Sequence, residues 1–286
     1  MKLIRRKVCC PQFVRAVSLV IICSAMFMAS SNARAQSLPR PEHVIVVVEE
    51  NHAYSQIIGS PEAPYINTLA SEGASFTQSY AITHPSQPNY LALFSGSTQG
   101  VTSDSCPHTF SAANLGSELI ASGKSFTGFS EGLPSVGSEV CTSGEYARKH
   151  SPWTNFSNVP SKSNQPFNDF PTNYADLPTI SWVIPNLEDD MHDGTIQQAD
   201  SWLQAHLQDY VTWAKKNNSL LIITWDEDDD TSVNKIPTIF VGPMVKPEKY
   251  STKITHYNVL RTLEAMYGLP YVGKSSSVTS ITAVWQ

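Results

Sequence analysis

The sequence predicts an α/β protein in which helices cover both faces of a mainly parallel central sheet, as in a three-layer α/β/α sandwich. Residues 43–48 and 220–225 are two continuous runs of mostly β-branched and other apolar side chains. Such runs are typical of strands that are buried on both faces of a parallel sheet. Candidate strands also alternate with candidate helices along the chain, which is the order that βαβ units require.

The first half of the chain contains further elements of both kinds. A short helix is predicted over 65–72, because Gly73 is a residue type that commonly ends helices. A strand is predicted over 76–82. The next helix covers 90–94, and Pro88 suits its first turn, where the missing amide hydrogen would be unpaired anyway.

The middle of the chain combines two strands with a long polar segment. Strands are predicted over 125–129 and 179–184. Residues 155–178 are rich in Pro, Asn and Ser, and they are expected to form a loop. Loops of this length in compact domains are usually lids or binding segments.

The last part of the chain continues the alternation. Thr195 begins a predicted helix, and Gln198 three residues later gives a capping-box pattern. A strand follows over 237–241. The final helix is predicted over 257–267 and ends at Gly268.

Residues 1–35 are predicted to be a signal peptide. Basic residues lie within 2–7, an apolar run covers 17–28, and Ala-Arg-Ala at 33–35 matches a small-x-small cleavage site. A retained anchor is the alternative, but the run is short for a span of about 20 residues. We expect cleavage to leave 36–286 as a single domain that is periplasmic or secreted and is not stably inserted in a membrane.

The charge of the chain limits its partners. It has 19 Lys and Arg and 25 Asp and Glu, and the first 35 residues hold six of the basic residues and none of the acidic ones. The remainder therefore carries 13 basic and 25 acidic residues, a formal charge of −12. This charge argues against nucleic acid as the main partner. It also requires a local cation to hold any anionic substrate.

Export would leave Cys106 and Cys141 as the cysteines of the mature chain. An even number of cysteines in an oxidising compartment predicts a disulfide between them. By restricting the unfolded chain, that disulfide would contribute roughly 3–4 kcal/mol to stability.

Acidic and amide side chains follow both buried strands. Glu50 and Asn51 end the first, and Asp226 and Glu227 end the second. The carboxyl ends of parallel strands lie at one edge of the sheet, where ligands bind. Carboxylates that meet there repel one another unless a cation lies between them, and oxygen ligands favour a hard or borderline divalent ion. The alternative is that each acid is a solvated turn residue or a helix cap.

Ser86 is the candidate nucleophile. It precedes a predicted helix, whose N-terminal amides and dipole attract anions, and Asn89 can donate a hydrogen bond to the same anion. A metal ion can activate a serine by lowering the pKa of its hydroxyl. The alternative role for Ser86 is that of a simple helix cap.

Histidines and basic residues supply further candidates. His192 lies in an acid-rich segment after a strand, and His256 precedes the last helix. Either can bind a second metal, hold phosphate oxygens or protonate a leaving group. Lys149 and His150 belong to a basic cluster in an acidic chain and are expected to face the substrate.

Five short motifs are distributed along most of the mature chain, and their order matters for the resemblance given below. They are VEEN at 48–51, THPSQPNY at 83–90 with SGSTQG at 95–100, PN at 185–186 with DMHDG at 190–194, TWDE at 224–227, and THY at 255–257 with LRTLE at 260–264. Together they resemble the phosphoesterase family of bacterial and fungal acid phosphatases and bacterial phospholipases C. That family belongs to the alkaline-phosphatase-like superfamily.

The resemblance implies an alkaline-phosphatase-like fold and a transiently phosphorylated Ser86. It implies one divalent metal ion, surrounded by Glu50, Asn51, Ser86, Asp226 and Glu227. It also implies a group around the phosphate, made of His84, Asn89, Asp190, His192 and His256. Because Asn51 is neutral where a two-zinc phosphatase would want a carboxylate, a one-metal site is preferred and a two-metal site is the alternative.

These observations predict an exported, metal-dependent phosphomonoesterase that resembles acid phosphatases and acts on small phosphate esters. Ser86 would form a phosphoserine, and His256 or His192 would protonate the leaving oxygen. A phosphodiesterase of the phospholipase C type is the alternative enzyme. A divalent-ion or phosphate-binding protein without turnover is the non-enzymatic alternative.

Overall fold

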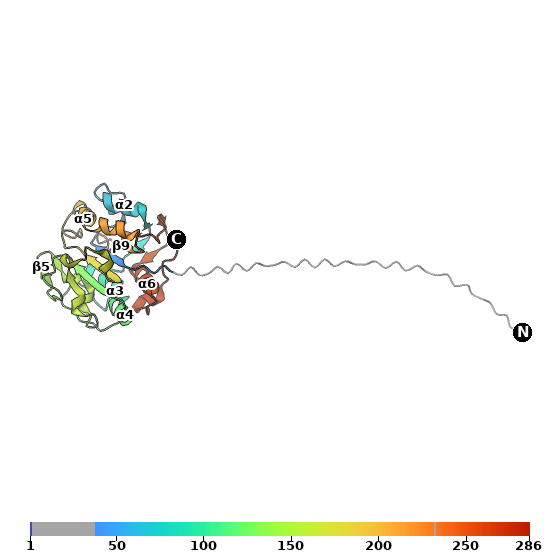
Figure 1. Cartoon of the computed structure of the whole chain (residues 1–286), viewed down its shortest axis with the longest axis horizontal. Coiled ribbons are helices and arrows are strands. Elements are labelled where there is room, and N and C mark those ends of the chain that lie inside the picture. The colour runs from blue at the N-terminus through green and yellow to red at the C-terminus, as the bar shows by residue number, and fades with distance from the viewer. Residues whose placement is uncertain (2–37, 232) are drawn as a thin grey trace. The chain divides into compact units, whose positions relative to one another are not determined.

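Helices pack on both faces of one large sheet in the computed structural model, which describes Met1, residues 38–231 and residues 233–286 (Figure 1). The predicted signal peptide and its cleavage site lie outside the described residues, apart from Met1. Among the helices that the structure describes, none has both the length and the apolar character needed to cross a bilayer.

The main sheet has eight strands in the order β12-β2-β11-β9-β1-β8-β4-β7. Their bounds are β1 Val44–Glu49, β2 Ala74–Phe76, β4 Phe126–Ser130, β7 Asn164–Pro166, β8 Ile180–Ile184, β9 Leu220–Trp225, β11 Thr238–Val241 and β12 Glu248–Tyr250. Neighbouring strands are parallel except where β11 pairs with β9 and with β2. The predicted mainly parallel sheet is confirmed.

Strand β1 lies at the centre of the sheet, between β8 and β9. All six of its residues are buried. Val44, Val46 and Val48 pack into one hydrophobic cluster, and Ile45 and Val47 pack into another. The side chains of this continuous apolar run therefore pack into the hydrophobic core on both faces of the sheet, as expected for a strand that is covered on both faces.

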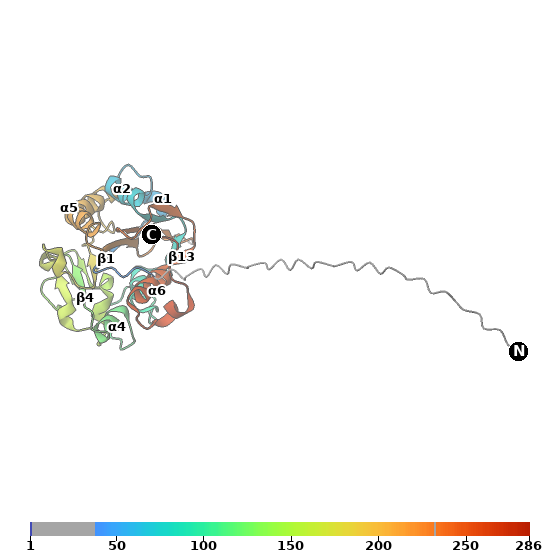
Figure 2. The same ribbon diagram turned by 45° about the vertical axis from the view of Figure 1, so that its right-hand side comes forward.

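Six α-helices are described. Their bounds are α1 Tyr54–Ile57, α2 Pro64–Glu72, α3 Ser86–Ser95, α4 Leu115–Ala121, α5 Ile196–Ala214 and α6 His256–Tyr267. Figure 2 shows α2 and α5 on one side of β1, and α4 and α6 on the other. The buried side chains of α3 belong to the same cluster as those of α4 and α6. The predicted α/β/α sandwich is confirmed.

Local signals set several helix ends. The Thr195 side chain accepts a hydrogen bond from the Gln198 amide at the start of α5, as the capping pattern predicts. Helix α6 ends at Gly268, in the left-handed conformation. Helix α3 ends at Gly96, with φ 68°, and a β-carbon there would lie 2.2 Å from the Val272 carbonyl oxygen. Only glycine fits that position.

Two predicted elements differ in the structure. The strand predicted over 76–82 is divided between β2 and β3 (Ser79–Tyr80), because β3 leaves the main sheet. It pairs with β10 (Lys235–Ile236) and β13 (Ile254–Thr255) in a separate three-stranded sheet. The loop predicted over 155–178 contains β7, which adds an edge strand to the main sheet beside β4.

The remaining elements are short. They are the paired strands β5 Thr142–Ser143 and β6 Tyr146–Ala147, and the 3₁₀ turns η1 Arg148–His150, η2 Pro152–Asn155, η3 Ser161–Ser163, η4 Phe167–Asp169, η5 Tyr174–Asp176 and η6 Gly273–Ser277. Cys106 and Cys141 form the predicted disulfide, with their Cα atoms 5.9 Å apart. It joins the segment between α3 and α4 to the start of the β5–β6 hairpin.

Candidate active site

The ends of β1 and β9 meet at the carboxyl edge of the sheet. The Asp226 amide donates to the Glu49 carbonyl oxygen at 2.9 Å, which continues the ladder between the two strands. The Asn51 amide donates to Asp226 Oδ1 at 3.2 Å, with Asn51 at φ 52°. Backbone pairing therefore brings together two acidic segments that are distant in sequence.

Ser86 is the first residue of α3, and its hydroxyl lies between two of these acids. Its Oγ is 3.0 Å from Glu50 Oε2 and 3.1 Å from Glu227 Oε1. The Ser86 side chain is almost fully buried. A hydroxyl has one proton, so it can donate to only one of the two carboxylates at a time.

The carboxylates around Ser86 are buried, and the positive charge near them is not enough to neutralise them. Burial, followed by the charge of Glu227, raises the pKa of Asp226 to about 8. Burial and the charges of Asp226 and Asp190 raise the pKa of Glu50 well above its usual value. Asp226 Oδ2 has no hydrogen-bond partner among the residues that the structure describes. A divalent cation would supply both the missing charge and the missing contact, so these residues fit one.

His150 lies between two buried acids. Its Nε2 is 3.0 Å from Glu50 Oε1, and its Nδ1 is 3.2 Å from Asp190 Oδ2. Burial lowers the pKa of His150 well below its usual value and raises that of Asp190 to about 8. One ligand atom from each of Glu50, His150 and Asp190 lies within 4.8 Å of the other two, a grouping that could hold a metal ion. This group shares only Glu50 with the predicted metal ligands.

Tyr90 belongs to the site, and the sequence analysis did not single it out. Its hydroxyl donates to Glu50 Oε1 at 2.6 Å, and its ring stacks on His150 with centroids 4.9 Å apart. Residues four apart on a helix share a face, so the position of Tyr90 relative to Ser86 was a signal that could have identified it.

Lys149 and His192 lie at a more exposed part of the site. Lys149 Nζ is 3.3 Å from His192 Nε2, and His192 Nδ1 is 2.7 Å from Asp193 Oδ1. Burial lowers the pKa of Lys149, but the charges of Glu50 and Asp104 outweigh burial and raise it overall. Lys149 therefore keeps its positive charge at neutral pH.

His84 contacts the acid cluster from the segment before α3. Its Nδ1 is 2.7 Å from Glu227 Oε2, and its Nε2 is 3.0 Å from the Thr231 carbonyl oxygen. Partial burial lowers its pKa, but these two contacts raise it overall. The protonated ring is thus favoured beside Glu227.

Asn89 is used differently from the predicted phosphate contact. Its Oδ1 accepts from the Ile82 and Thr83 amides at 3.0 Å each, and its Nδ2 donates to the Thr83 carbonyl oxygen at 2.8 Å. The same Nδ2 lies 3.3 Å from Glu227 Oε2. The Asn89 side-chain amide therefore stabilises the turn that positions Ser86.

His256 lies on the inner side of the acid cluster. Its Nε2 is 2.7 Å from the Asp226 carbonyl oxygen, and the side chain is buried. Burial lowers the pKa of His256 to about 4. The imidazole is therefore neutral at ordinary pH, which makes it a poor proton donor.

The acidic run after β9 is divided by the fold. Asp226 and Glu227 point into the site, whereas Asp228 accepts from the Thr231 amide at 2.8 Å and the Lys235 amide at 3.1 Å. Asp229 and Asp230 are exposed. The first two acids of the run thus face the Ser86 site, whereas Asp228 and Asp230 lie within 4.0 Å of the His84 ring.

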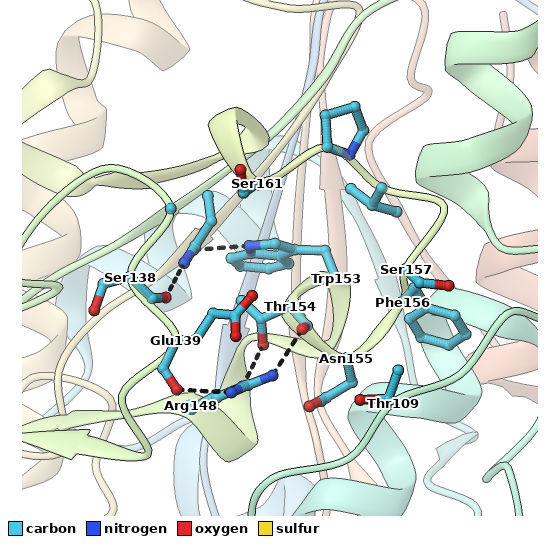
Figure 3. A pocket seen from close by; sticks show the side chains of 14 residues that line it. Thr109, Ser138, Glu139, Arg148, Trp153, Thr154, Asn155, Phe156, Ser157 and Ser161 are labelled. Atoms are coloured by element: carbon cyan, nitrogen blue, oxygen red, sulfur yellow. Dashed lines mark hydrogen bonds between the residues drawn. The ribbon is translucent and has the colours of Figure 1, made fainter.

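A separate polar cavity is present around the 3₁₀ turn η2 (Figure 3). Its volume is about 310 Å³, and Arg148, Trp153 and Asn155 are among its lining residues. Arg148 donates to the Glu139 carbonyl oxygen at 2.7 Å and to the Thr154 carbonyl oxygen at 2.8 Å. None of the predicted site residues lines this cavity, so it is distinct from the Ser86 site.

Two phosphatases are similar to this chain in sequence. A phosphatidylinositol-3-phosphatase of Mycobacterium tuberculosis is 52% identical over 281 residues, covering 95% of this chain and 94% of the relative. A phosphate-repressible acid phosphatase of Penicillium chrysogenum is 31% identical, covering 73% of this chain. The matching part is 55% of the Penicillium protein, which is thus considerably longer.

The fold has relatives among solved structures. A protein of the alkaline phosphatase superfamily from Vibrio parahaemolyticus aligns with a TM-score of 0.58 at 14% identity, covering 85% of this chain and 71% of the other. Residues 60–270 match the Phosphoesterase family. Together with the 52% identical relative, this match shows that the chain belongs to the phosphoesterase family and is a phosphoric ester hydrolase.

Proposed function

We propose that the chain is an exported, metal-dependent phosphomonoesterase that forms a phosphoserine at Ser86, with residues 36–286 as its phosphoesterase domain. The observation that carries the proposal is the Ser86 hydroxyl, 3.0 Å from Glu50 and 3.1 Å from Glu227 at the N-terminus of α3. A serine in that position has an acceptor for its proton and a helix end that favours an anion.

The divalent cation would be held by the acid cluster. Its ligands would come from Glu50, Asn51, Ser86, Asp226 and Glu227. When bound, such an ion lowers the pKa of a neighbouring hydroxyl and offsets the negative charge of a phosphate. Glu50, His150 and Asp190 offer the alternative of a second ion at the same cluster.

The residues of the chain would carry the reaction in two displacements. Ser86 Oγ passes its proton to a hydrogen-bonded carboxylate and attacks phosphorus while the bond to the leaving oxygen breaks. His192 Nε2 gives that oxygen a proton, and Lys149 pairs with the phosphate oxygens. Water then attacks the phosphoserine and gives a proton to His192. The protonated carboxylate returns its proton to Ser86 Oγ as the bond between Ser86 and phosphorus breaks, and inorganic phosphate leaves. His192 is preferred to His256 as the donor, because His256 is buried and neutral.

The relatives favour a monoester substrate. The name of the 52% identical protein describes removal of a phosphate group from a phosphorylated lipid, and that group is a monoester. The Penicillium relative is named an acid phosphatase. We therefore propose phosphate monoesters, with phosphorylated lipid headgroups included in the class, rather than the diesters that a phospholipase C cleaves.

Ser86→Ala tests the proposal. Turnover of an aryl phosphate should fall roughly 10³-fold or more, because the nucleophile is lost. Thermal unfolding should change little. Ser201→Ala is the matched control, since Ser201 is an exposed serine on α5 whose hydroxyl donates to the Gln197 carbonyl oxygen of the same helix. Near-normal turnover by Ser86→Ala would contradict the assignment, and preferred hydrolysis of a bis-aryl phosphate would favour the diesterase.

A further inference from the structure

We propose that Asp104 is a positioning residue that aims the Lys149 ammonium at the substrate phosphate, and that the Cys106–Cys141 disulfide holds Asp104 in place. The inference rests on the proposed function, because it takes Lys149 as a phosphate contact. Asp104 lies outside the motifs that the sequence analysis singled out.

Asp104 connects Lys149 to the start of the nucleophile helix. Its Oδ1 accepts a hydrogen bond from the Gln87 amide at 2.9 Å, and Gln87 directly follows Ser86. Its Oδ2 accepts from Lys149 Nζ at 3.1 Å. A carboxylate is favoured at this end of a helix. One side chain thus ties the position of Lys149 to the segment that carries Ser86.

Lys149 is directed from two sides. An ammonium has three donors. One is used by Asp104 Oδ2 at 3.1 Å, and a second approaches His192 Nε2 at 3.3 Å when that nitrogen carries no proton. The third remains for a phosphate oxygen. Without Asp104 the long Lys149 side chain would regain rotamer freedom, which phosphate binding would then have to remove.

The segment that carries Asp104 is itself anchored. Gln87 is buried, and with its amide nitrogen turned toward the loop it donates to the Ser105 carbonyl oxygen at 2.7 Å and the Ser103 carbonyl oxygen at 3.2 Å. These bonds hold the residues on either side of Asp104. The position of the Asp104 side chain is therefore fixed by the segment that carries it.

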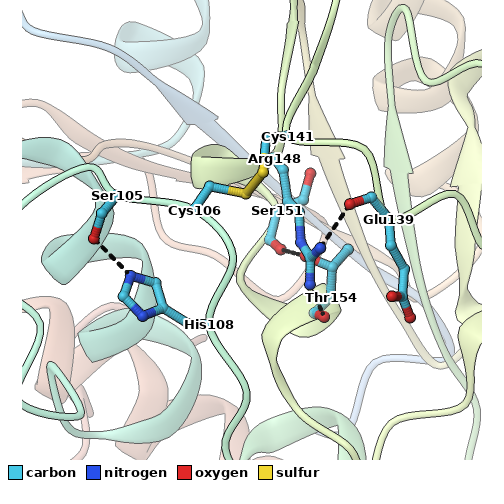
Figure 4. Close-up of a disulfide and its surroundings, with 8 residues drawn as sticks. All are labelled: Ser105, Cys106, His108, Glu139, Cys141, Arg148, Ser151 and Thr154. Carbon is cyan, nitrogen blue, oxygen red and sulfur yellow. Dashed lines mark hydrogen bonds between the residues drawn. A yellow bond between two sulfur atoms is a disulfide. The ribbon is translucent and has the colours of Figure 1, made fainter.

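The Cys106–Cys141 disulfide links the segments that carry the two partners of the ion pair. Figure 4 shows the disulfide between Ser105 and Arg148, the neighbours in sequence of Asp104 and Lys149. Cys106 lies two residues after Asp104. The carbonyl oxygen of Cys141 accepts from the Arg148 amide at 2.9 Å, one residue before Lys149. Asp104 and Lys149 are thus each fixed close to the same covalent link.

A purely electrostatic role for Asp104 predicts the opposite result. A negative charge beside an anion site repels phosphate, so removing that charge alone would strengthen phosphate binding. Removing a positioning residue would weaken it. The sign of the change therefore separates the two explanations.

The test measures binding of inorganic phosphate to the metal-loaded protein by calorimetry. Asp104→Asn should weaken it about 5- to 10-fold, with a similar rise in KM for an aryl phosphate and a smaller change in kcat. Ser103→Ala is the matched control, because Ser103 is exposed on the same loop and its hydroxyl donates to the Ser105 hydroxyl, away from Lys149. Asp104→Ser serves as a second variant if Asp104→Asn does not fold.

A double-mutant cycle with Lys149→Met completes the test. If Asp104 acts through Lys149, Asp104→Asn should cause no further loss of phosphate affinity in the Lys149→Met protein. Tighter binding by Asp104→Asn, unchanged binding, or additive losses in the cycle would each overturn the proposal. Phosphate binding needs no turnover, so this result is independent of whether Ser86→Ala abolishes the reaction.

Discussion

The two halves of the active site are built in different ways. The acidic half, made of Glu50, Asp226 and Glu227, stands at the ends of neighbouring strands whose backbones pair up to the last residue. The basic half, made of Lys149, His150 and His192, comes from a 3₁₀ turn and from the segment after β8. The sheet places the first half, whereas side-chain contacts and a disulfide place the second. The basic half should therefore be more sensitive to changes outside the site.

Tyr90 joins the two halves. It donates to Glu50 and stacks on His150, so one helix residue contacts an acid from β1 and a histidine from η1. Helix α3 thereby aligns three groups at once, since it also begins with Ser86. Any movement of this helix would change both halves together.

The largest effect is expected from breaking the acidic half. Asp226→Asn keeps an acceptor for the Asn51 amide but removes the charge, and it should lower cation affinity at least about 100-fold. Elemental analysis after gel filtration measures the bound metal. Asp229→Asn is the control, because Asp229 is exposed in the same acidic run. Full metal content in Asp226→Asn would refute its role as a ligand.

Removing the disulfide should affect the basic half of the site but not the acidic half. The Cys106→Ser, Cys141→Ser double variant should lose roughly 3–4 kcal/mol of unfolding free energy. Phosphate affinity should fall because the Asp104 segment is released, while metal content should stay near that of the wild type. Denaturant titration, calorimetry and elemental analysis measure the three quantities. If the double variant lost metal but kept its phosphate affinity, the disulfide would support the acidic half and not the basic half.

The smallest effect is expected at a buried acid outside both halves. Glu264 accepts from the Val272 amide at 2.8 Å and from the Ser275 hydroxyl at 2.6 Å, so both of its oxygens have partners. Asp226 differs, because its Oδ2 has no partner among the described residues. Burial raises its pKa to about 7, above the ordinary value of 4.5. The folded state thus favours the protonated form, and the stability that this form provides is lost as pH rises from 4.5 through 7.

Glu264→Gln should remove that dependence. The unfolding free energy of the wild type, relative to Glu264→Gln, should decrease across this pH interval, as thermal unfolding in a pH series would show. Cation affinity should not change in the variant. A parallel pH profile for the two proteins would show that Glu264 does not titrate with folding.

The sequence predicted the acidic half better than the basic half. Glu50 and Asp226 were found because each follows an apolar run, and parallel strands bring such ends to one edge. Nothing in the sequence placed Asp104 beside Lys149, because their contact depends on two irregular segments and a disulfide. The hydrogen bonds of Asn89 to the segment before α3 were also not predicted, since they depend on a turn whose shape is set by tertiary packing.

Strand and helix periodicity was enough to establish the layered α/β architecture and the acids that follow the central strands, and the two cysteines left after export were enough to predict the disulfide. The first two features follow from short-range patterns and from backbone pairing, and the third follows from the cysteine count. Only the tertiary structure decided that Tyr90 bridges Glu50 and His150, that His256 is buried against the Asp226 backbone, and that Asp104 holds Lys149. Such contacts depend on where individual side chains point after packing, which no local pattern specifies.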